Sequence, residues 1–389
     1  MTTNAPTFDA IVVGLGAMGS AAAYHLARRG QRVLGLDASA PGHTQGSSHG
    51  ETRIIRLSYF EHPHYVPLLR RAYSLWRDLQ EQAGEELLRL TGGIYLGPPD
   101  GELVAGARRS AQEYALAHEL LDPDDVRRRF PQFALADGHA ALYEAEAGVL
   151  FPEKCIAAHL RLAASHGAAL RHEDPVLTWD AGGGGVEVKT GSATYHAARL
   201  VLTAGAWMQT MLGPGIPLLL RAERNVVFWL KPQADPALFD SDHFPIFIWE
   251  TAHGHFYGLP HIQRPGVKVA LHHAGEFGDP DTLDRTTRPT DEAPVRQFVR
   301  HHIPGLDGPI ESSLPCLYTL TPDGHFVIDR HPAHAQVVFA SACSGHGFKF
   351  ASVIGEILAD LSTSGQTTAA DFLRLARFTQ PSDTTTRRG

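Results

Sequence analysis

The segment from residue 8 to residue 37 constrains the fold of this chain more than any other stretch. It reads FDAIVVGLGAMGSAAAYHLARRGQRVLGLD, in which an apolar run, a glycine turn, a run with Ala, Tyr and Leu at helical spacing and a second apolar run follow one another. Short apolar runs bounded by glycines are typical of buried strands, and the run between them is typical of a helix. The segment therefore predicts a βαβ unit, as found in α/β folds.

The glycines of this unit have the spacing of a dinucleotide-binding turn. Gly14, Gly16 and Gly19 stand where the turn must be tight, where a pyrophosphate must approach the backbone, and where helix and strand must pack closely. Asp37 ends the second strand, where a carboxylate can accept a hydrogen bond from a ribose hydroxyl. A glycine turn without a ligand is the alternative, and the pattern does not distinguish FAD from NAD. The cofactor-binding residues predicted from this unit are Gly14, Leu15, Gly16, Ala17, Met18, Gly19 and Asp37.

The composition argues against several classes of partner. With 34 basic and 42 acidic residues the net charge is -8, and no long block of like charges occurs, so neither nucleic acid nor a membrane surface is an expected partner. Three cysteines, at positions 155, 316 and 343, form neither a disulfide framework nor a metal-binding pattern, which favours a reducing cytoplasm. The N-terminus lacks the pattern of a signal peptide, and no apolar run is long enough to span a membrane. We expect a small-molecule partner.

The chain alternates between two kinds of segment. Strand-to-helix patterns with glycine turns occur at the start, in the middle and at the end, whereas strands of alternating character, such as ERNVVFWL and FPIFIWE, occupy the region from 222 to 320. We predict an α/β, Rossmann-like dinucleotide-binding domain interleaved with an α+β substrate domain built on an antiparallel sheet. The predicted ranges are 1–88, 150–221 and 322–380 for the first domain, 89–149 and 222–321 for the second, and 381–389 for a polar tail.

The stretch SGHGFKF, residues 344–350, predicts a site for negative charge. A turn with Gly345 and Gly347 that opens a helix aims unpaired backbone N–H groups at whatever lies in front of it. Lys349 would lie in the first helical turn, where cations are disfavoured, which suggests an anionic partner such as a carboxylate. A solvated lysine on a surface helix is the alternative.

Two further stretches carry basic residues in informative positions. In TRIIR, Arg53 and Arg56 would share a face if the segment were helical and would otherwise project separately; each could bind a carboxylate or form an ordinary surface ion pair. In GVKVALHH, a strand would place Lys268 and His272 on the same face. The alternative for Lys268 is an edge strand that uses lysine to prevent aggregation.

The histidines do not predict a metal site. The chain has 23 histidines, including HPH at 62–64 and HGH at 253–255. Neither cluster has a helical His-x-x-x-His arrangement with a glutamate or a neighbouring group of cysteines, which are the usual zinc patterns. The serines of GHTQGSS lack the turn of a hydrolase nucleophile.

Taken together, these stretches resemble the family of monomeric sarcosine oxidases and N-methyltryptophan oxidases over essentially the whole chain. The family motif SHHGDTRIIR appears here as SSHGETRIIR, and GHGFKF recurs unchanged. The family's spacing of lysine and histidine is matched by Lys268 and His272, and its flavin-bearing cysteine falls on Cys316 in CLYT. The resemblance implies a flavoprotein that uses FAD.

The resemblance also implies contacts with the cofactor. Cys316 would be joined through its sulfur to the 8-methyl group of FAD, with a buried, inert thiol as the alternative. Cys155 and Cys343 are assigned to that alternative. The other cofactor-binding residues expected are His49, Thr52, Arg53, Val176, Gly345, Gly347 and Lys349.

A second set of residues is expected around the substrate. Lys349 and Arg56 resemble the family's clamp for the substrate carboxylate. Tyr318 and Tyr257 resemble walls of the substrate pocket, and His272 resembles the histidine beside the substrate amine. The implied reaction is oxidation of a secondary amino acid such as sarcosine to the primary amino acid and formaldehyde, with oxygen reduced to hydrogen peroxide.

Lys268 resembles the lysine that, through water, holds positive charge near N5 and C4a of the flavin. A cation at that place would stabilise superoxide as it forms from oxygen. The catalytic residues implied by the resemblance are Lys268, His272, Arg56, Lys349, Tyr318, Tyr257 and Arg53.

Some positions depart from the family pattern. Glu51 replaces an aspartate, and Ile248 stands where sarcosine oxidases have methionine, so a bulky or cyclic substrate such as N-methyl-L-tryptophan is an alternative to sarcosine. Two other classes compete: a flavin dehydrogenase with another electron acceptor, against which Lys268 counts, and a nucleotide-binding regulatory protein, against which the basic clamp counts. The expected oligomeric state is a monomer.

Overall fold

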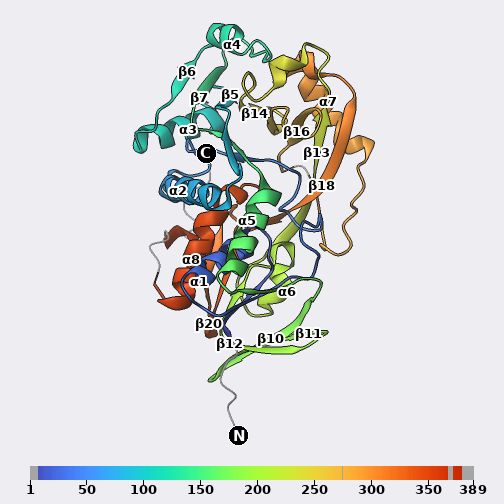
Figure 1. Cartoon of the computed structure of the whole chain (residues 1–389). Helices are drawn as coiled ribbons and strands as arrows, with labels where there is room; N and C mark the ends of the chain where they lie inside the picture. Colours follow the sequence, from blue (N-terminus) through green and yellow to red (C-terminus); the bar gives the residue numbers. More distant parts are fainter. Residues whose placement is uncertain (1–7, 274, 367–370, 379–389) are drawn as a thin grey trace.

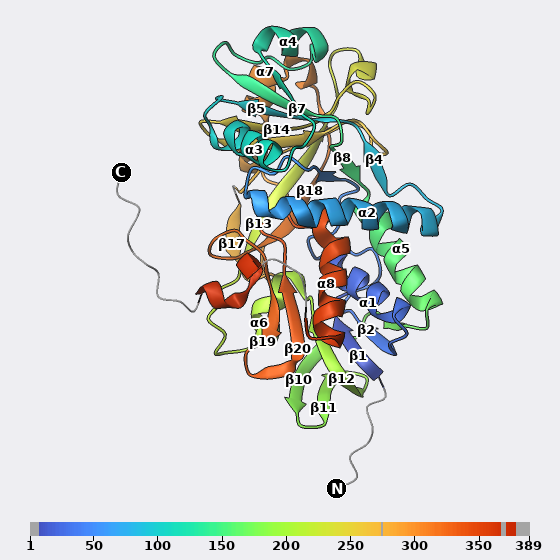
Figure 2. The same cartoon turned by 90° about the vertical axis from the view of Figure 1, so that its left-hand side faces the viewer.

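The computed structural model describes residues 8–273, 275–366 and 371–378. The predicted polar tail, 381–389, and the ends of the predicted first domain, 1–7 and 379–380, lie outside these ranges. Two large sheets form the lower and upper parts of the molecule in Figures 1 and 2, and the helix α2 (Val66–Ala83) runs between them.

The lower sheet contains the predicted βαβ unit. In the described part of the chain its eight strands follow the order β10-β11-β12-β1-β2-β9, with β20 beside β12 and β19 beside β20. β1 (Phe8–Val13) pairs in parallel with β2 (Val33–Leu36) and with β12 (Thr194–Leu202), which confirms the predicted unit. The other strands are β9 (Ala169–Arg171), β10 (Val176–Gly182), β11 (Gly185–Thr190), β19 (Val327–His331) and β20 (His334–Ser341).

Three helices pack side by side against this sheet: α1 (Ala17–Arg28), α5 (Pro152–Ser165) and α8 (Ala351–Thr363) (Figure 2). Gly355 allows α8 to approach α1, because a Cβ at this position would lie 2.4 Å from the Cβ of Ala21. The sequence pattern predicts that α8 stops at Gly365, and the helix ends at Thr363 with Gly365 in the left-handed region.

The upper sheet is mainly antiparallel, as predicted. Its nine strands follow the order β17-β13-β16-β15-β14-β5-β7-β6, and β18 also pairs with β13. The helix α7 (Pro289–His302) covers one face, where the rings of Phe256 and Phe298 stack with their centres 4.2 Å apart. The strands are β5 (Gly93–Gly97), β6 (Glu119–Leu121), β7 (Ala140–Glu144), β13 (Arg221–Leu230), β14 (Ile246–Thr251), β15 (Gly254–Leu259), β16 (Val267–Leu271), β17 (Glu276–Gly278) and β18 (Ile310–Leu320).

A third, smaller sheet is separate from the two large ones in its strand pairing. It consists of β3 (Arg53–Ile55), β4 (Leu88–Leu90) and β8 (Gly148–Leu150), with β8 in the centre. The central residues of TRIIR, Arg53–Ile55, therefore form a strand, and the possibility that Arg53 and Arg56 share a helical face is wrong. The remaining α-helices are α3 (Glu102–Glu113), α4 (Pro123–Arg129) and α6 (Met208–Leu212).

The predicted fold class, an α/β unit interleaved with an antiparallel sheet, is confirmed. Within the ranges that the structure covers, no helix is both long enough and apolar enough to cross a membrane.

Candidate active site

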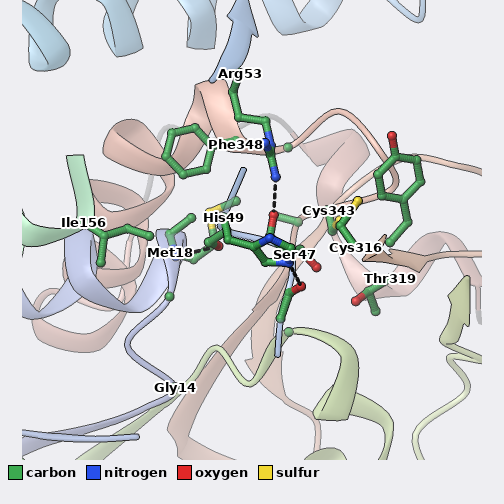
Figure 3. Close-up of a pocket in the computed structure, with 18 of the residues that line it drawn as sticks. Gly14, Met18, Ser47, His49, Arg53, Ile156, Cys316, Thr319, Cys343 and Phe348 are labelled. Carbon is green, nitrogen blue, oxygen red and sulfur yellow. Dashed lines mark hydrogen bonds between the residues drawn. The ribbon is translucent and has the colours of Figure 1, made fainter. Parts of the chain in front are cut away.

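A cavity of about 900 Å³ extends from the glycine turn after β1 to the upper strands β15, β16 and β18. Both large sheets and the small sheet contribute to its lining. Figure 3 shows part of it, with Met18 and Ile156 on one side and Cys316, Cys343 and Thr319 on the other. A cavity of this size that is lined by both a nucleotide-type turn and polar side chains is suited to a large cofactor together with a small substrate.

The glycine turn forms one end of the cavity. A Cβ at Gly14 would lie 2.5 Å from the carbonyl oxygen of Thr203, and one at Gly19 would lie 1.7 Å from that of Gly14, so both positions exclude a side chain. At Gly16 a Cβ would meet only the Ser48 hydroxyl, at 3.4 Å. The turn is thus tightly packed behind and open in front, as a pyrophosphate requires.

Asp37 closes the turn from the end of β2. Its carboxylate accepts a hydrogen bond of 2.7 Å from the backbone N–H of Leu15 and one of 2.9 Å from that of Ser39. Both Asp37 and Val176 line the cavity. These contacts fix the Asp37 side chain beside the turn, where it can also accept from a ribose hydroxyl.

Two basic residue types line the cavity here: Arg53 at the start of β3, and His49 in the segment before it. Arg53 donates to the carbonyl oxygen of Ser47 at 2.8 Å (Figure 3). It also donates to the carbonyl oxygen of Thr52 at 2.8 Å. The Nε2 of His49 lies 3.0 Å from the carbonyl oxygen of Gly46. Burial lowers the pKa of His49 to about 3, with Arg53 acting in the same direction, so this ring is neutral at physiological pH.

Cys316 lies on β18, and its side chain faces the cavity with 5% of the residue exposed. Burial raises the pKa of its thiol, while Arg53 and Lys268 act in the opposite direction. The neighbouring cations therefore favour the thiolate at a site that would otherwise disfavour it. Cys155, by contrast, is buried in the core of the lower part, and burial raises the pKa of its thiol strongly.

Lys268 is in the interior of the upper sheet. Its strand, β16, lies between β13 and β15, so the alternative of an edge-strand lysine is wrong. The residue is 2% exposed, and its ammonium donates to the carbonyl oxygens of Gly50 and Thr52, each at 2.9 Å. Burial lowers the pKa of Lys268 well below its usual value, and Arg53 lowers it further. A positive charge on this buried lysine therefore has to be stabilised by hydrogen bonds and by nearby negative charges.

Arg56 follows β3 and is 2% exposed, which excludes an ordinary surface ion pair. Its Nη2 donates to both carboxylate oxygens of Glu61, at 2.7 and 2.6 Å, and its Nη1 donates to the carbonyl oxygen of Ser58 at 3.1 Å. The guanidinium carbon lies 4.2 Å from the centre of the Tyr59 ring. The guanidinium is therefore oriented to bind a carboxylate. The carboxylate that it binds here is the side chain of Glu61.

Lys349 lies in a 3₁₀ turn, Phe348–Phe350, that precedes α8, rather than in the first turn of the α-helix as predicted. It is buried, so the surface-lysine alternative is wrong. Its ammonium donates to the carbonyl oxygen of His346 at 2.6 Å and lies 5.3 Å from the centre of the Tyr59 ring. Burial lowers the pKa of Lys349 to about 7, with Arg56 as the next cause. Both cations thus face the same tyrosine.

An aromatic wall adjoins these cations. The hydroxyl oxygens of Tyr257 and Tyr318 are 3.5 Å apart, and the Nδ1 of His272 lies 3.4 Å from the Tyr318 hydroxyl. A Cβ at Gly345 would lie only 2.6 Å from the His272 ring, so the ring packs on the backbone of the glycine turn. Burial raises the pKa of Tyr257 to about 12 and lowers that of His272 well below its usual value. All three groups are therefore uncharged at neutral pH.

The residues present fit FAD. Within the described part of the chain, several buried polar atoms on the cavity wall have no hydrogen-bond partner: Ser47 Oγ, His49 Nδ1, Thr319 Oγ1 and Ser341 Oγ. Buried polar atoms normally have partners, so these atoms indicate a polar ligand along the cavity. The glycine turn would hold the pyrophosphate, and the cavity between Arg53 and Cys316 would hold the flavin.

A model of the family described as FAD dependent oxidoreductase matches residues 9–361. The chain belongs to this family. It is 46% identical over 367 residues to a monomeric sarcosine oxidase from Streptomyces avermitilis, covering 93% of this chain and 95% of that one. It is 36% identical over 378 residues to an N-methyl-L-tryptophan oxidase from Salmonella typhi, covering 96% and 100%. Its structure is similar to that of NikD, an unusual amino acid oxidase essential for nikkomycin biosynthesis, with a TM-score of 0.82, 25% identity and coverage of 95% and 96%.

In this FAD dependent oxidoreductase, all the predicted site residues but one line the cavity. The exception is Gly19, whose place is behind the turn, against the carbonyl group of Gly14. The structure brings Arg56, Lys268 and Lys349, which come from distant parts of the sequence, to the wall of one cavity. Arg56 and Lys349 both lie near the Tyr59 ring.

Sequence reasoning missed two acidic residues at the site of this family member. Glu61 pairs with Arg56, and the Glu153 carboxylate accepts hydrogen bonds from the backbone N–H groups of Gly50 and Glu51. Neither lies in a recognisable motif. A signal for Glu61 was its position five residues after Arg56, whereas nothing local could have linked Glu153 to a turn 103 residues earlier.

Proposed function

We propose that this protein is an oxidase that removes the N-methyl group of a secondary amino acid such as sarcosine. The amino acid, oxygen and water give the primary amino acid, formaldehyde and hydrogen peroxide. The observation that carries the proposal is the pair of buried cations, Arg56 and Lys349, that face the Tyr59 ring in the wall of a cavity that a dinucleotide-binding turn also lines. The names of the relatives at 46% and 36% identity agree with it.

The cations and the aromatic wall would bind and orient the substrate. The Arg56 guanidinium, which already donates from Nη2 to both carboxylate oxygens of Glu61, would bind the substrate carboxylate, and Lys349 adds a second positive charge. The neutral His272 ring, beside Tyr318, offers a single donor or acceptor to the substrate amine without repelling its positive form. Fixing the carboxylate at one end and the amine at the other holds the N-methyl group in one orientation, which supplies much of the rate enhancement.

Bound FAD supplies the electron acceptor for the oxidation of the methyl carbon–nitrogen bond and returns its electrons to oxygen. The role proposed for Lys268 is to hold a positive charge where oxygen is reduced, because a fixed cation in a buried site stabilises the negative charge that develops there. The buried position of this lysine, with its ammonium held by backbone carbonyl groups, supports this role.

We also propose a covalent bond between Cys316 and the cofactor. The attachment would replace one hydrogen of the 8-methyl group by the Cys316 sulfur; the thiol and the methyl group would each release a proton, and oxygen would take up the two electrons. The cations Arg53 and Lys268, which favour the thiolate, and the position of Cys316 on the cavity wall support this attachment.

The proposal includes the domain division predicted from the sequence and a monomer in the cytoplasm. The two large sheets support the division. The word monomeric in the name of the relative from Streptomyces avermitilis supports the oligomeric state, and the three unpaired cysteines support a reducing compartment.

The test is a product balance with purified protein. Oxygen uptake, formaldehyde and peroxide are measured with sarcosine, with N-methyl-L-tryptophan and with proline as a cyclic secondary amino acid. Formaldehyde and peroxide formed in equal amounts with an N-methyl amino acid are expected, and the better substrate shows what the pocket beside Ile248 accepts. Peroxide without formaldehyde, from proline alone, would favour a cyclic substrate, and oxidation without peroxide would favour a dehydrogenase.

A further inference from the structure

The peptide group between Gly50 and Glu51 lies between the carboxylate of Glu153 and the ammonium of Lys268. Its carbonyl oxygen, from Gly50, accepts a hydrogen bond of 2.9 Å from the ammonium of Lys268. Its N–H, from Glu51, donates to the carboxylate of Glu153 at 3.0 Å. A carboxylate on the N–H side and an ammonium on the C=O side both polarise a peptide group in the same sense, so the two charges reinforce one another through it.

The backbone is shaped for this arrangement. Gly50 has a φ of 97° and Glu51 a φ of 68°, so two successive residues are in the left-handed region. Their N–H groups point the same way and both reach Glu153, that of Gly50 at 2.7 Å. Consecutive N–H groups of this kind form a concave site for an anion. A non-glycine residue such as Glu51 adopts this conformation only when its surroundings enforce it.

The groups around Lys268 show why the carboxylate of Glu153 matters for the charge of this lysine. Burial and Arg53 lower the pKa of Lys268, whereas Cys316, Glu153 and Glu51 raise it. The indole of Trp229 adds a weaker attraction, with the ammonium 5.3 Å from the ring centre.

The two carboxylates beside this turn differ in their partners. The Glu51 carboxylate is engaged by Arg264 at 2.7 Å. The hydrogen bonds that the structure records for Glu153 go only to backbone N–H groups, and in the described part of the chain this carboxylate forms no ion pair. The charge of Glu153 is therefore not neutralised locally by a partner of its own.

We propose that Glu153 sustains the positive charge of Lys268 through the Gly50–Glu51 peptide, and so acts as a positioning residue for the reaction with oxygen. The inference rests on the proposed oxidase function, in which oxygen takes two electrons from the reduced cofactor and two protons to become hydrogen peroxide. If Lys268 loses its positive charge, it no longer stabilises the negative charge that develops on oxygen. The oxidation of the amine does not require the positive charge of Lys268.

The first test separates the two halves of the reaction by rapid mixing. Glu153→Gln keeps an oxygen that can accept from both N–H groups and removes only the charge. It should leave anaerobic reduction by the substrate nearly unchanged and slow reoxidation by oxygen by about tenfold. Glu153→Asp, which keeps the charge, should restore part of the rate. Glu51→Gln is the matched control, because its carboxylate is already paired with Arg264, and it should change reoxidation by less than about twofold.

The second test needs no turnover. The melting temperature of the purified protein is measured from pH 6 to pH 10 for the wild type, Glu153→Gln, Lys268→Met and the double variant. Because the lowered pKa of Lys268 means that the unfolded chain binds its proton more tightly, stability rises with pH over this window. The deficit of Glu153→Gln should be largest near pH 6 and shrink toward pH 10, and Lys268→Met should abolish this pH dependence.

The outcomes are distinct. If Glu153→Gln slows both halves equally, or if its stability deficit is the same at every pH, Glu153 is a structural residue of the turn and the inference is wrong. If Lys268→Met leaves reoxidation unchanged, the inference about oxygen is also wrong, but continued formation of formaldehyde and peroxide would leave the proposed oxidase function intact. Absence of these products in the wild type would refute that function itself.

Discussion

Substrate binding is tested most directly at Arg56, because the carboxylate of Glu61 already accepts hydrogen bonds from its guanidinium. Glu61 accepts hydrogen bonds of 2.6 and 2.7 Å from one guanidinium nitrogen in a pocket where Arg56 is 2% exposed. Burial opposes ionisation of Glu61, but Arg56, His346 and Lys349 keep the pKa of its carboxyl below the usual value. A substrate carboxylate that binds Arg56 therefore shares the guanidinium with a charged competitor.

Two substitutions should change the Michaelis constant in opposite directions. Arg56→Met removes a buried charge partner of the substrate carboxylate, which costs about 2 to 5 kcal/mol, or about 30-fold or more in KM. Glu61→Gln replaces a charged acceptor by a neutral one. Charged and neutral hydrogen bonds differ by about 1 kcal/mol, so the substrate should gain about fivefold in affinity.

The assay is steady-state oxidation of sarcosine over a wide concentration range. Arg56→Met leaves Glu61 unpaired and so risks unfolding; the double variant Arg56→Met with Glu61→Gln removes both charges and serves as the folded reference. It should retain the high KM of the single Arg56 variant. An unchanged KM in Glu61→Gln would mean that the substrate does not compete for Arg56, and a higher one would mean that Glu61 orients the guanidinium for binding.

Three other substitutions test separate parts of the site. In Cys316→Ser, acid precipitation should release the flavin into the supernatant, whereas a flavin that stays in the pellet would place the covalent bond elsewhere. Gly347→Ala should lower the melting temperature by several degrees, because its Cβ would lie 1.7 Å from the carbonyl oxygen of Ala342; Gly183→Ala, with nothing within 4 Å, should not. Affinity for methoxyacetate, a carboxylate without an amine, should fall as pH rises through about 7, where Lys349 loses its charge, and this trend should vanish in Lys349→Met.

The parts of the fold that local sequence encodes were predictable. The βαβ unit needs only neighbouring residues to be recognised, and β1, α1 and β2 form as expected. TRIIR was ambiguous because its conformation depends on pairing of β3 with Gly148–Leu150, which lies far along the chain. A segment of this length has no periodicity strong enough to decide between helix and strand.

The same distinction applies to the site. Lys268 could be an edge residue or an interior one until its neighbours β13 and β15 were known. Lys349 and Arg56 were expected from the family resemblance, but their shared position over Tyr59 depends on the packing of the two ends of the chain. Glu153 could not be found from sequence, because its hydrogen bonds go to backbone groups that carry no residue-specific signal.

The most direct measurement of the central claim is an anaerobic titration of the purified protein with sarcosine, followed by its absorbance spectrum. A yellow flavin band that bleaches with sarcosine or N-methyl-L-tryptophan, and returns with formation of hydrogen peroxide when oxygen is admitted, is the predicted result. A bound flavin that neither compound reduces, or that oxygen does not restore, would contradict the assignment of this protein as an N-methyl amino acid oxidase.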